Sequence, residues 1–212
     1  MADDLVFYTH PMSRGRVSRW MLEEVGQPYR TEIVDYGTTM KAPAYLAINP
    51  MGKVPAVVHR GTVITENAAI CAYLADAFPD SGLAPPHGDP SRGSYYRWMF
   101  FAAGPFEAAV TNKALGVEAA PDRKGMLGYG SLDDVLTTLE KLLSDRDYVA
   151  GDRFTAADLY LGSHVGWGMQ FGTIEKRPAF ERYWERLAGR PAAVRAREID
   201  DNFIASMKAK AS

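Results

Sequence analysis

Only one cysteine, Cys71, occurs in the 212 residues, and no apolar run approaches the roughly 20 residues that a membrane helix needs. A single cysteine excludes an internal disulfide, so we expect a reducing compartment, the cytoplasm. Because no apolar run is long enough to span a membrane, we expect no membrane partner. The formal net charge of −2 lacks the basic excess typical of nucleic-acid-binding proteins, so no nucleic-acid partner is expected. The four histidines include no pair at metal-ligand spacing, and we therefore expect no metal site.

What the sequence does contain changes in character once along the chain. Residues 5–78 alternate strand-like and helix-like segments in the order β-α-β-α-β-β-α, which predicts a small α/β domain. The Pro- and Gly-rich stretch PDSGLAPPHGDP that follows predicts a linker. Helical patterns continue from there, so the expected division is an α/β domain at 1–79, a linker at 80–90 and an all-α domain at 91–212.

Turn residues and periodicity set the expected bounds of the elements. In the first domain we expect strands at 5–9, 29–36, 55–60 and 62–65, a hairpin turn at Arg60-Gly61, and helices at 16–26, 42–49 and 66–78. In the second we expect helices at 94–110, 132–143, 156–169, 179–189 and 192–207, the first broken or kinked at Gly104-Pro105. The best marked helix start is Thr155 with Asp158 three residues on, which predicts a capping box that stabilises the fold rather than catalyses.

The stretch MGKVPAVVHRGTVITENAAI, residues 51–70, combines a strand that begins with proline and a helix that begins with Glu66 and Asn67. A cis Pro55 would leave the N–H and C=O of Val54 as a short exposed edge that could pair with an extended peptide. The N–H groups at the helix start attract a carboxylate, and Glu66 would accept a hydrogen bond from an ammonium group. A small peptide with a free α-amino acid end fits, because it offers an extended backbone, a carboxylate and an ammonium group.

Three motifs carry a resemblance to a known family: KVPAV at 53–57, ITENAAICAYLADAFP at 64–79 and GDRFTAADLYL at 151–161. With them the sequence resembles the soluble, cytosolic-type glutathione S-transferases, in particular bacterial members, over essentially the whole chain. The resemblance implies a thioredoxin-like N-terminal domain that binds glutathione and an all-α C-terminal domain that forms the wall for a second substrate. It also implies a cis Pro55, a homodimer, and glutathione as co-substrate without a permanently bound cofactor.

The same resemblance assigns glutathione-binding positions. Val54 matches the residue whose backbone pairs with the cysteinyl unit of glutathione. Glu66 and Asn67 match the pair that holds the γ-glutamyl end. Lys41 and Lys53 match positions whose side chains often meet the glycyl carboxylate. The full expected set is Arg14, Lys41, Lys53, Val54, Pro55, Glu66 and Asn67. Asn67 departs from the family, which usually has serine there, and we expect binding to persist with altered geometry.

The group that activates the thiol should lie in FYTHPMSRGRVSRW, just after the first strand. A thiol with a pKa of about 8.5 is only a few per cent ionised at pH 7, so a hydroxyl donating to the sulfur would favour the thiolate. Ser13 matches the S-R pattern of many bacterial members and is the expected donor, Tyr8 is the alternative, and Arg14 or the backbone alone is a third possibility. Ser13 also fits a plain helix cap. Cys71 lies in an apolar helix pattern and is expected in the core.

The pocket for the second substrate is expected between Met12 and the first helix of the second domain. Its candidate lining residues there are Tyr96, Met99, Phe100 and Phe106. Met and aromatic walls suit hydrophobic electrophiles. The resemblance therefore implies a detoxifying transferase that conjugates the glutathione thiolate to such electrophiles. Glutathione-dependent isomerisation or peroxide reduction, and a non-catalytic binding protein of the same fold, remain alternatives.

Overall fold

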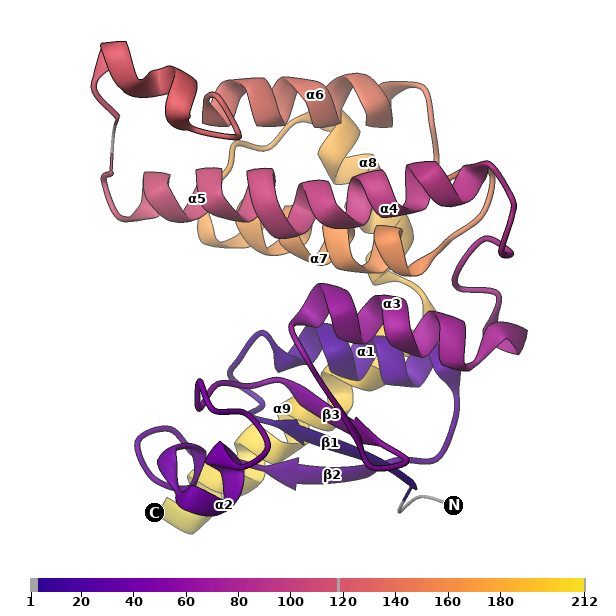
Figure 1. Ribbon diagram of the computed structural model, residues 1–212, viewed down its shortest axis with the longest axis vertical. Coiled ribbons are helices and arrows are strands. Elements are labelled where there is room, and N and C mark those ends of the chain that lie inside the picture. The colour runs from indigo at the N-terminus through magenta and orange to yellow at the C-terminus, as the bar shows by residue number, and fades with distance from the viewer. Residues whose placement is uncertain (1–3, 118, 212) are drawn as a thin grey trace. The chain divides into compact units, whose positions relative to one another are not determined.

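The computed structural model describes residues 4–117 and 119–211, and their contacts divide the chain into two compact units. Unit 1 contains the chain up to Ser81 and again from Gly189, and unit 2 is Gly82–Ala188. Figure 1 shows a small sheet with helices in unit 1 and helices alone in unit 2. Within the described part of the chain, no helix is long and apolar enough to cross a membrane.

The sheet of unit 1 has four strands in the order β2-β1-β3-β4. They are β1 (Leu5–Thr9), β2 (Arg30–Ile33), β3 (Ala56–His59) and β4 (Thr62–Thr65). β1 pairs with β2 in parallel and with β3 antiparallel, and β3 and β4 form the predicted hairpin. Arg60 and Gly61 both have positive φ, of 50° and 79°, as a tight hairpin turn with the favoured twist requires. The predicted mixture of a parallel crossover and an antiparallel hairpin is confirmed.

Helices α1 (Gly15–Val25) and α3 (Asn67–Ala77) lie side by side over this sheet in Figure 1 and contact each other. α1 ends where predicted, because Gly26 adopts the left-handed conformation and its N–H bonds to Leu22 C=O. The second predicted strand, 29–36, was too long. Pairing stops at Ile33, and Gly37 with a φ of 74° belongs to the turn that follows. The short segments η2 (Thr39–Lys41), α2 (Pro43–Leu46) and η3 (Pro79–Ser81) complete this part of the unit.

The last helix, α9 (Pro191–Ala211), packs against α1 within unit 1. We expected this stretch in the all-α domain at 91–212, because a helical pattern does not reveal which neighbour its buried face meets. Arg19 of α1 and Asp200 of α9 form an ion pair with an Nε–Oδ1 distance of 2.9 Å, and both side chains are 1% exposed. The guanidinium of Arg19 also lies over the rings of Phe7 and Phe203. Charge pairing and aromatic packing together fix α9 to α1.

Unit 2 consists of helices whose positions agree with the predicted ones. They are α4 (Ser91–Phe101), α5 (Glu107–Ala114), α6 (Leu132–Ser144), α7 (Ala156–Phe171) and α8 (Pro178–Ala188), with a short 3-10 helix, η5 (Pro121–Met126), after α5. The expected interruption at Gly104-Pro105 is a π-helical turn, Ala102–Phe106, between α4 and α5. Because Pro105 lacks an N–H, the wider turn lets the chain stay helical on both sides of it.

The capping box at the start of α7 is confirmed and is wholly buried. The carboxylate of Asp158 accepts hydrogen bonds from the N–H and hydroxyl of Thr155, both at 2.9 Å, and from Val149 N–H at 2.8 Å. The Tyr183 hydroxyl on α8 donates to the same carboxylate at 3.0 Å. Burial raises the pKa of Asp158 to about 6, while these four donors act in the opposite direction. Asp158 thus ties α7, α8 and the preceding loop together.

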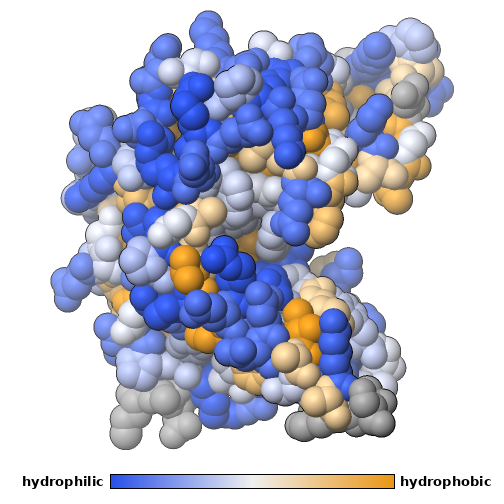
Figure 2. All heavy atoms as spheres, turned by 180° about the vertical axis from the view of Figure 1, so that it is seen from behind, coloured by the Kyte–Doolittle hydropathy of each residue, from blue (hydrophilic) through white to orange (hydrophobic). Residues whose placement is uncertain are grey.

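Exposed apolar side chains of unit 2 gather at the connection between α5 and α6. Leu115, Val117 and Met126 are each more than half exposed there. Figure 2 shows apolar atoms at this tip, among the predominantly hydrophilic surface of the surrounding helices. The tip lies outside every set of site residues expected from the sequence.

Candidate active site

The loop between β1 and α1 holds Ser13 in a defined hydrogen-bonding position. Its hydroxyl donates to His10 C=O at 2.6 Å and accepts from Gly15 N–H at 2.9 Å. The N-cap of α1 is Arg14, so Ser13 accepts from the first N–H of the helix from the position before the cap, and its one proton is directed at a carbonyl. Gly15 is required beside it, because a Cβ there would lie 2.1 Å from Thr9 Oγ1. To donate to a sulfur, the Ser13 hydroxyl must rotate away from His10.

His10 supports this loop, a role that was not assigned to it from the sequence. It is buried, its Nδ1 accepts from Met12 N–H at 3.2 Å, and its ring centroid lies 4.6 Å from that of Tyr36. Burial lowers the pKa of His10, against the opposing effect of the Asp35 carboxylate 3.9 Å from Nε2. A neutral imidazole with Nδ1 as acceptor thus holds the backbone on either side of Pro11.

Tyr8, the alternative thiol-activating residue, packs against a cluster of buried side chains on one face of the sheet. Its ring centroid lies 5.7 Å from that of Tyr45. The cluster consists of Val34, Met40, Tyr45 and Ala56. Tyr8 is half-buried in this packing, whereas Ser13 lies in the loop beyond the strand. The two candidates therefore have different surroundings, and their competing roles remain predictions.

The segment before β3 is fixed by bonds to its carbonyls. The Val54–Pro55 peptide bond is cis, as predicted. Lys53 C=O accepts from Tyr45 hydroxyl at 2.6 Å and from Asn49 Nδ2 at 2.8 Å, which locks the peptide that precedes Val54. β3 begins only at Ala56, so Val54 lies ahead of the paired part of the strand. The expected backbone edge at Val54 is consequently held in place by side chains of α2 and its loop.

The two lysines expected near the glycyl carboxylate differ in their surroundings. Lys41 Nζ donates to Met51 C=O at 3.1 Å and to Gly52 C=O at 2.7 Å, so its ammonium is engaged by the loop before β3. Gly52 has a φ of 57°, and a Cβ at this position would lie 2.8 Å from Lys41 Nζ. Lys53 is exposed. Both lysines are thus exposed, and the ammonium of Lys41 additionally organises the loop through its two carbonyl contacts.

Glu66 and Asn67 form the junction between β4 and α3. Glu66 is exposed and has a φ of 66°, a strained conformation for a residue other than glycine. Its carbonyl accepts from Ile70 N–H at 2.8 Å and so begins α3. The Asn67 side chain turns toward α1, where Oδ1 accepts from Ser18 hydroxyl at 2.7 Å and Nδ2 donates to Arg14 C=O at 3.1 Å. The structure thus joins Asn67 directly to the loop that carries Ser13 and Arg14.

The candidates for the second-substrate pocket divide by exposure. Met12 in unit 1 is 61% exposed, and on α4 of unit 2 Tyr96 is 38% and Phe100 67% exposed. Met99 and Phe106 are 2% and 1% exposed and pack in the core of unit 2, so they present no open surface. Cys71 is also buried, as predicted, and burial raises the pKa of its thiol. A pocket formed by Met12, Tyr96 and Phe100 remains a prediction.

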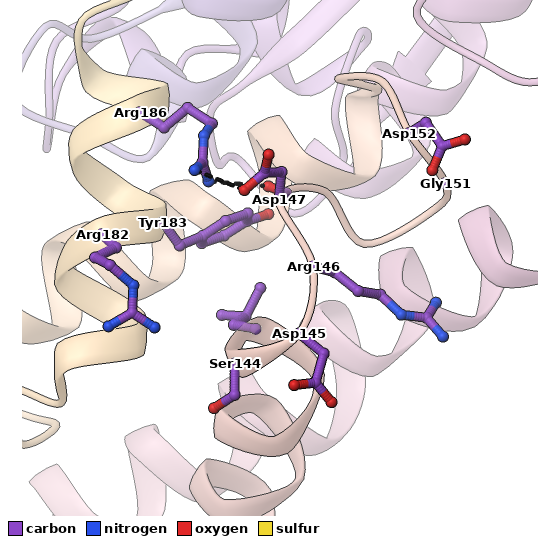
Figure 3. Close-up of a pocket in the computed structure, with 10 residues that line it drawn as sticks. Ser144, Asp145, Arg146, Asp147, Gly151, Asp152, Arg182, Tyr183 and Arg186 are labelled. Atoms are coloured by element: carbon purple, nitrogen blue, oxygen red, sulfur yellow. Dashed lines mark hydrogen bonds and ion pairs between the residues drawn. The ribbon is translucent and has the colours of Figure 1, made fainter.

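A groove of about 520 Å³ in unit 2 is lined by none of the predicted site residues (Figure 3). Ser144, Asp145, Asp147, Tyr183 and Arg186 are among the residues that line it. Arg186 is paired with Asp147 at 2.6 Å, and Tyr183 turns its hydroxyl to the buried capping box. The groove therefore has a mixed-charge lining, and three of its polar side chains, Asp147, Tyr183 and Arg186, make contacts within the fold. Among the residues described, no group of three or more His, Cys, Asp or Glu side chains could hold a metal ion.

Comparison with known proteins gives matches in both units. Residues 13–77 match the family model described as glutathione S-transferase, N-terminal domain, and residues 130–191 match the one described as glutathione S-transferase, C-terminal domain. A glutathione S-transferase of Xanthomonas campestris, GST-4.5, is 31% identical over 188 residues, which cover 85% of this chain and 91% of that protein. GstA of Escherichia coli O157:H7 is 32% identical over 149 residues, which cover 69% and 73% of the two chains.

Solved structures give the same result. A glutathione transferase from Methylococcus capsulatus has a TM-score of 0.76 and 31% identity, covering 93% of this chain and 98% of that one. A sphingomonad glutathione S-transferase in complex with glutathione has the same TM-score and identity, with coverage of 92% and 98%. The similarity thus extends over both units and includes a protein with glutathione bound.

Proposed function

Since the chain belongs to the glutathione S-transferase family, has its fold and functions as a glutathione transferase, we propose that it conjugates the glutathione thiolate to hydrophobic electrophiles in a detoxifying role. In this proposal glutathione is the co-substrate and no permanently bound cofactor is needed. In this proposal residues 1–79 bind glutathione and the helices that follow the linker at 80–90 supply the second wall. The protein acts in the cytoplasm as a homodimer, which predicts twice the 23.4 kDa chain mass in light scattering.

The geometry of Glu66 carries the proposal. A strained, exposed acidic residue at the start of α3 is typical of a ligand site, because surrounding structure must hold it in that conformation. The Glu66 carboxylate accepts from the γ-glutamyl ammonium, and the first N–H groups of α3, including that of Asn67, receive the carboxylate. The backbone of Val54 pairs with the cysteinyl unit, and Lys53 meets the glycyl carboxylate at the other end.

The thiol is then placed near the start of α1. Ser13 donates to the sulfur and favours the thiolate, with Tyr8 or Arg14 and the backbone as the alternatives. The thiol releases its proton to solvent. The thiolate then attacks the electrophilic carbon and the S–C bond forms. A leaving group departs with its bonding electrons or, in an addition, the π electrons move onto the substrate, which takes a proton from solvent. Met12, Tyr96 and Phe100 contact the apolar part of the electrophile in this proposal.

The test combines binding with the titration of the bound thiol. The protein should be retained on immobilised glutathione and should conjugate at least one member of a panel of electrophiles. Replacing Glu66 by alanine should weaken glutathione binding by about 1.5–3 kcal/mol, because the ammonium loses a charged partner. Retention without turnover on conjugation, isomerisation or peroxide substrates would refute the proposed chemistry. Unchanged affinity of Glu66→Ala in calorimetry would remove Glu66 from the site.

The same titration separates the two hydroxyl candidates. If Ser13 donates to the sulfur, Ser13→Ala should raise the apparent pKa of bound glutathione and slow conjugation at neutral pH roughly ten- to hundredfold. Tyr8→Phe should leave that pKa nearly unchanged. Thiolate absorbance against pH measures both effects. A shift in Tyr8→Phe alone would give the role to Tyr8, and no shift in either variant would leave it to Arg14 or the backbone.

A further inference from the structure

Asn67 links the starts of two helices through its side-chain amide. Ser18, wholly buried on α1, donates to Asn67 Oδ1 at 2.7 Å, and Asn67 Nδ2 donates to Arg14 C=O at 3.1 Å. The orientation of the amide is determined by its partners, because a carbonyl only accepts and therefore requires the NH₂ side. The amide consequently bridges α3 and α1 in one direction only.

The carbonyl that Asn67 contacts also accepts from Val17 N–H at 3.1 Å, and it belongs to the peptide unit that carries Gly15 N–H. That N–H donates to Ser13 Oγ at 2.9 Å, and Ser13 Oγ donates to His10 C=O at 2.6 Å. Because a peptide unit is planar and rigid, fixing its C=O also fixes the direction of its N–H. A continuous series of hydrogen bonds therefore runs from Ser18 through Asn67 and the Arg14–Gly15 peptide to the Ser13 hydroxyl.

We infer that Asn67 is a positioning residue for thiol ionisation: its amide holds the Arg14–Gly15 peptide plane and thereby orients Ser13 and the first N–H groups of α1 around the sulfur. The inference rests on the proposed function. Serine, the residue expected at this position from the family resemblance, has a shorter side chain with one proton and could not reach both Ser18 and Arg14. Asn67 thus connects the γ-glutamyl end of the site to its sulfur end by a route that serine lacks.

The test measures thiol ionisation and ligand affinity separately. Thiolate absorbance against pH gives the apparent pKa of bound glutathione, and calorimetry gives the affinity for S-methylglutathione, which has no thiol to ionise. Asn67→Ala should raise the apparent pKa by about half a unit or more, equivalent to roughly threefold less thiolate at pH values below it. The affinity for S-methylglutathione should stay within about twofold, since the backbone N–H that receives the carboxylate remains. Asn67→Ser should resemble Asn67→Ala.

Two further variants make the test decisive. Ser18→Ala removes the buried hydroxyl that orients the amide and should shift the pKa in the same direction by a smaller amount. Tyr73→Phe is the matched control, because it removes a 2.9 Å bond between α3 and His59 Nδ1 that lies outside this series. It should leave the thiol pKa unchanged. Because Ser18 is wholly buried, a shift in Ser18→Ala cannot arise from lost contact with glutathione.

The possible results lead to different conclusions. An unchanged pKa in Asn67→Ala and Ser18→Ala would overturn the inference, and so would a tenfold loss of S-methylglutathione affinity without a pKa shift, which would make Asn67 a direct ligand. If Asn67→Ala changes both quantities or does not fold, Ser18→Ala decides. Failure of the unsubstituted protein to bind or conjugate glutathione would instead refute the proposed function.

Discussion

Replacing Asp158 by alanine should destabilise the protein far more than the loss of an ordinary helix cap. The carboxylate accepts four hydrogen bonds of 2.8–3.0 Å in a site with no solvent exposure. Alanine leaves the N–H groups of Val149 and Thr155 buried without their acceptor, at about 1–3 kcal/mol each. The Tyr183 hydroxyl keeps a weaker contact with Asp158 C=O at 3.4 Å, so its loss is smaller. The free energy of unfolding should fall by about 3–5 kcal/mol.

The chain offers a matched control at the start of α6. Ser131 and Asp134 form the same capping box, with Asp134 Oδ2 3.0 Å from Ser131 N and Ser131 Oγ 3.1 Å from Asp134 N. Asp134 is exposed, so water can take over its bonds when the carboxylate is removed. Asp134→Ala should therefore cost only about 0.5–2 kcal/mol, the usual value for a cap.

Urea denaturation of the two variants and the unsubstituted protein measures the difference, provided that the slope m is unchanged. The reasoning requires Asp158→Ala to cost at least about twice as much as Asp134→Ala, because the Asp158 box is buried and its carboxylate also accepts from Val149 N–H and the Tyr183 hydroxyl. Equal losses near 1 kcal/mol would refute it. They would mean that water enters and satisfies the donors of the buried box.

Three other perturbations follow from particular contacts. In urea denaturation, Arg19→Met should lower the free energy of unfolding by about 3–5 kcal/mol, because the buried Asp200 carboxylate loses its partner. Asp201→Asn, which removes the exposed pair with Arg16 at the same helix interface, should cost under about 1 kcal/mol. Burial lowers the pKa of His10, so the unfolded chain binds more protons below about pH 6.5 and stability should fall there, less steeply in His10→Asn. In melting experiments Gly166→Ala should destabilise the protein, because a Cβ there would lie 2.5 Å from the indole ring of Trp184. Gly93→Ala, whose Cβ would meet no atom within 4 Å, should stabilise it through the higher helix propensity of alanine. Constant stability from pH 7 to 5, or a stabilised Gly166→Ala, would contradict these expectations.

The elements that the sequence predicted are those whose signals are local. The hairpin turn at Arg60-Gly61, the end of α1 at Gly26 and the box at Thr155 each depend on residues within a few positions of one another. The second strand was predicted too long because VDY continues a strand-like pattern. The structure leaves the strand at Ile33 and turns at Gly37, one residue beyond the predicted end, so the turn residue did not mark where pairing stops.

What the sequence did not predict depends on contacts between distant segments. The helical pattern of α9 does not specify that its buried face meets α1, since any apolar neighbour would satisfy the same periodicity. Met99 and Phe106 have the residue types of a substrate-binding wall, and only the packing of unit 2 shows them to be core. The bonds of Lys41 to the 51–52 carbonyls and of Asn67 to Ser18 likewise join segments separated in sequence. Residue type and spacing alone could not distinguish these roles.

Thiol activation is the point at which residue type and observed geometry lead to different expectations. The Ser13 hydroxyl has one proton, and that proton is directed at His10 C=O. A sulfur at the start of α1 must either draw the hydroxyl away from this carbonyl or be held by N–H groups. A hydrogen bond to an anion is roughly twice as strong as one between neutral groups, so rotation toward a thiolate is favourable while rotation toward a neutral thiol gains little. A hydroxyl that moves only for the ionised sulfur stabilises that form selectively, and this difference is what lowers a thiol pKa. The hydrogen bond from Ser13 to His10 C=O is therefore compatible with the proposed role. The hydrogen bond from Ser13 to the thiolate must be stronger than this bond, because it replaces it.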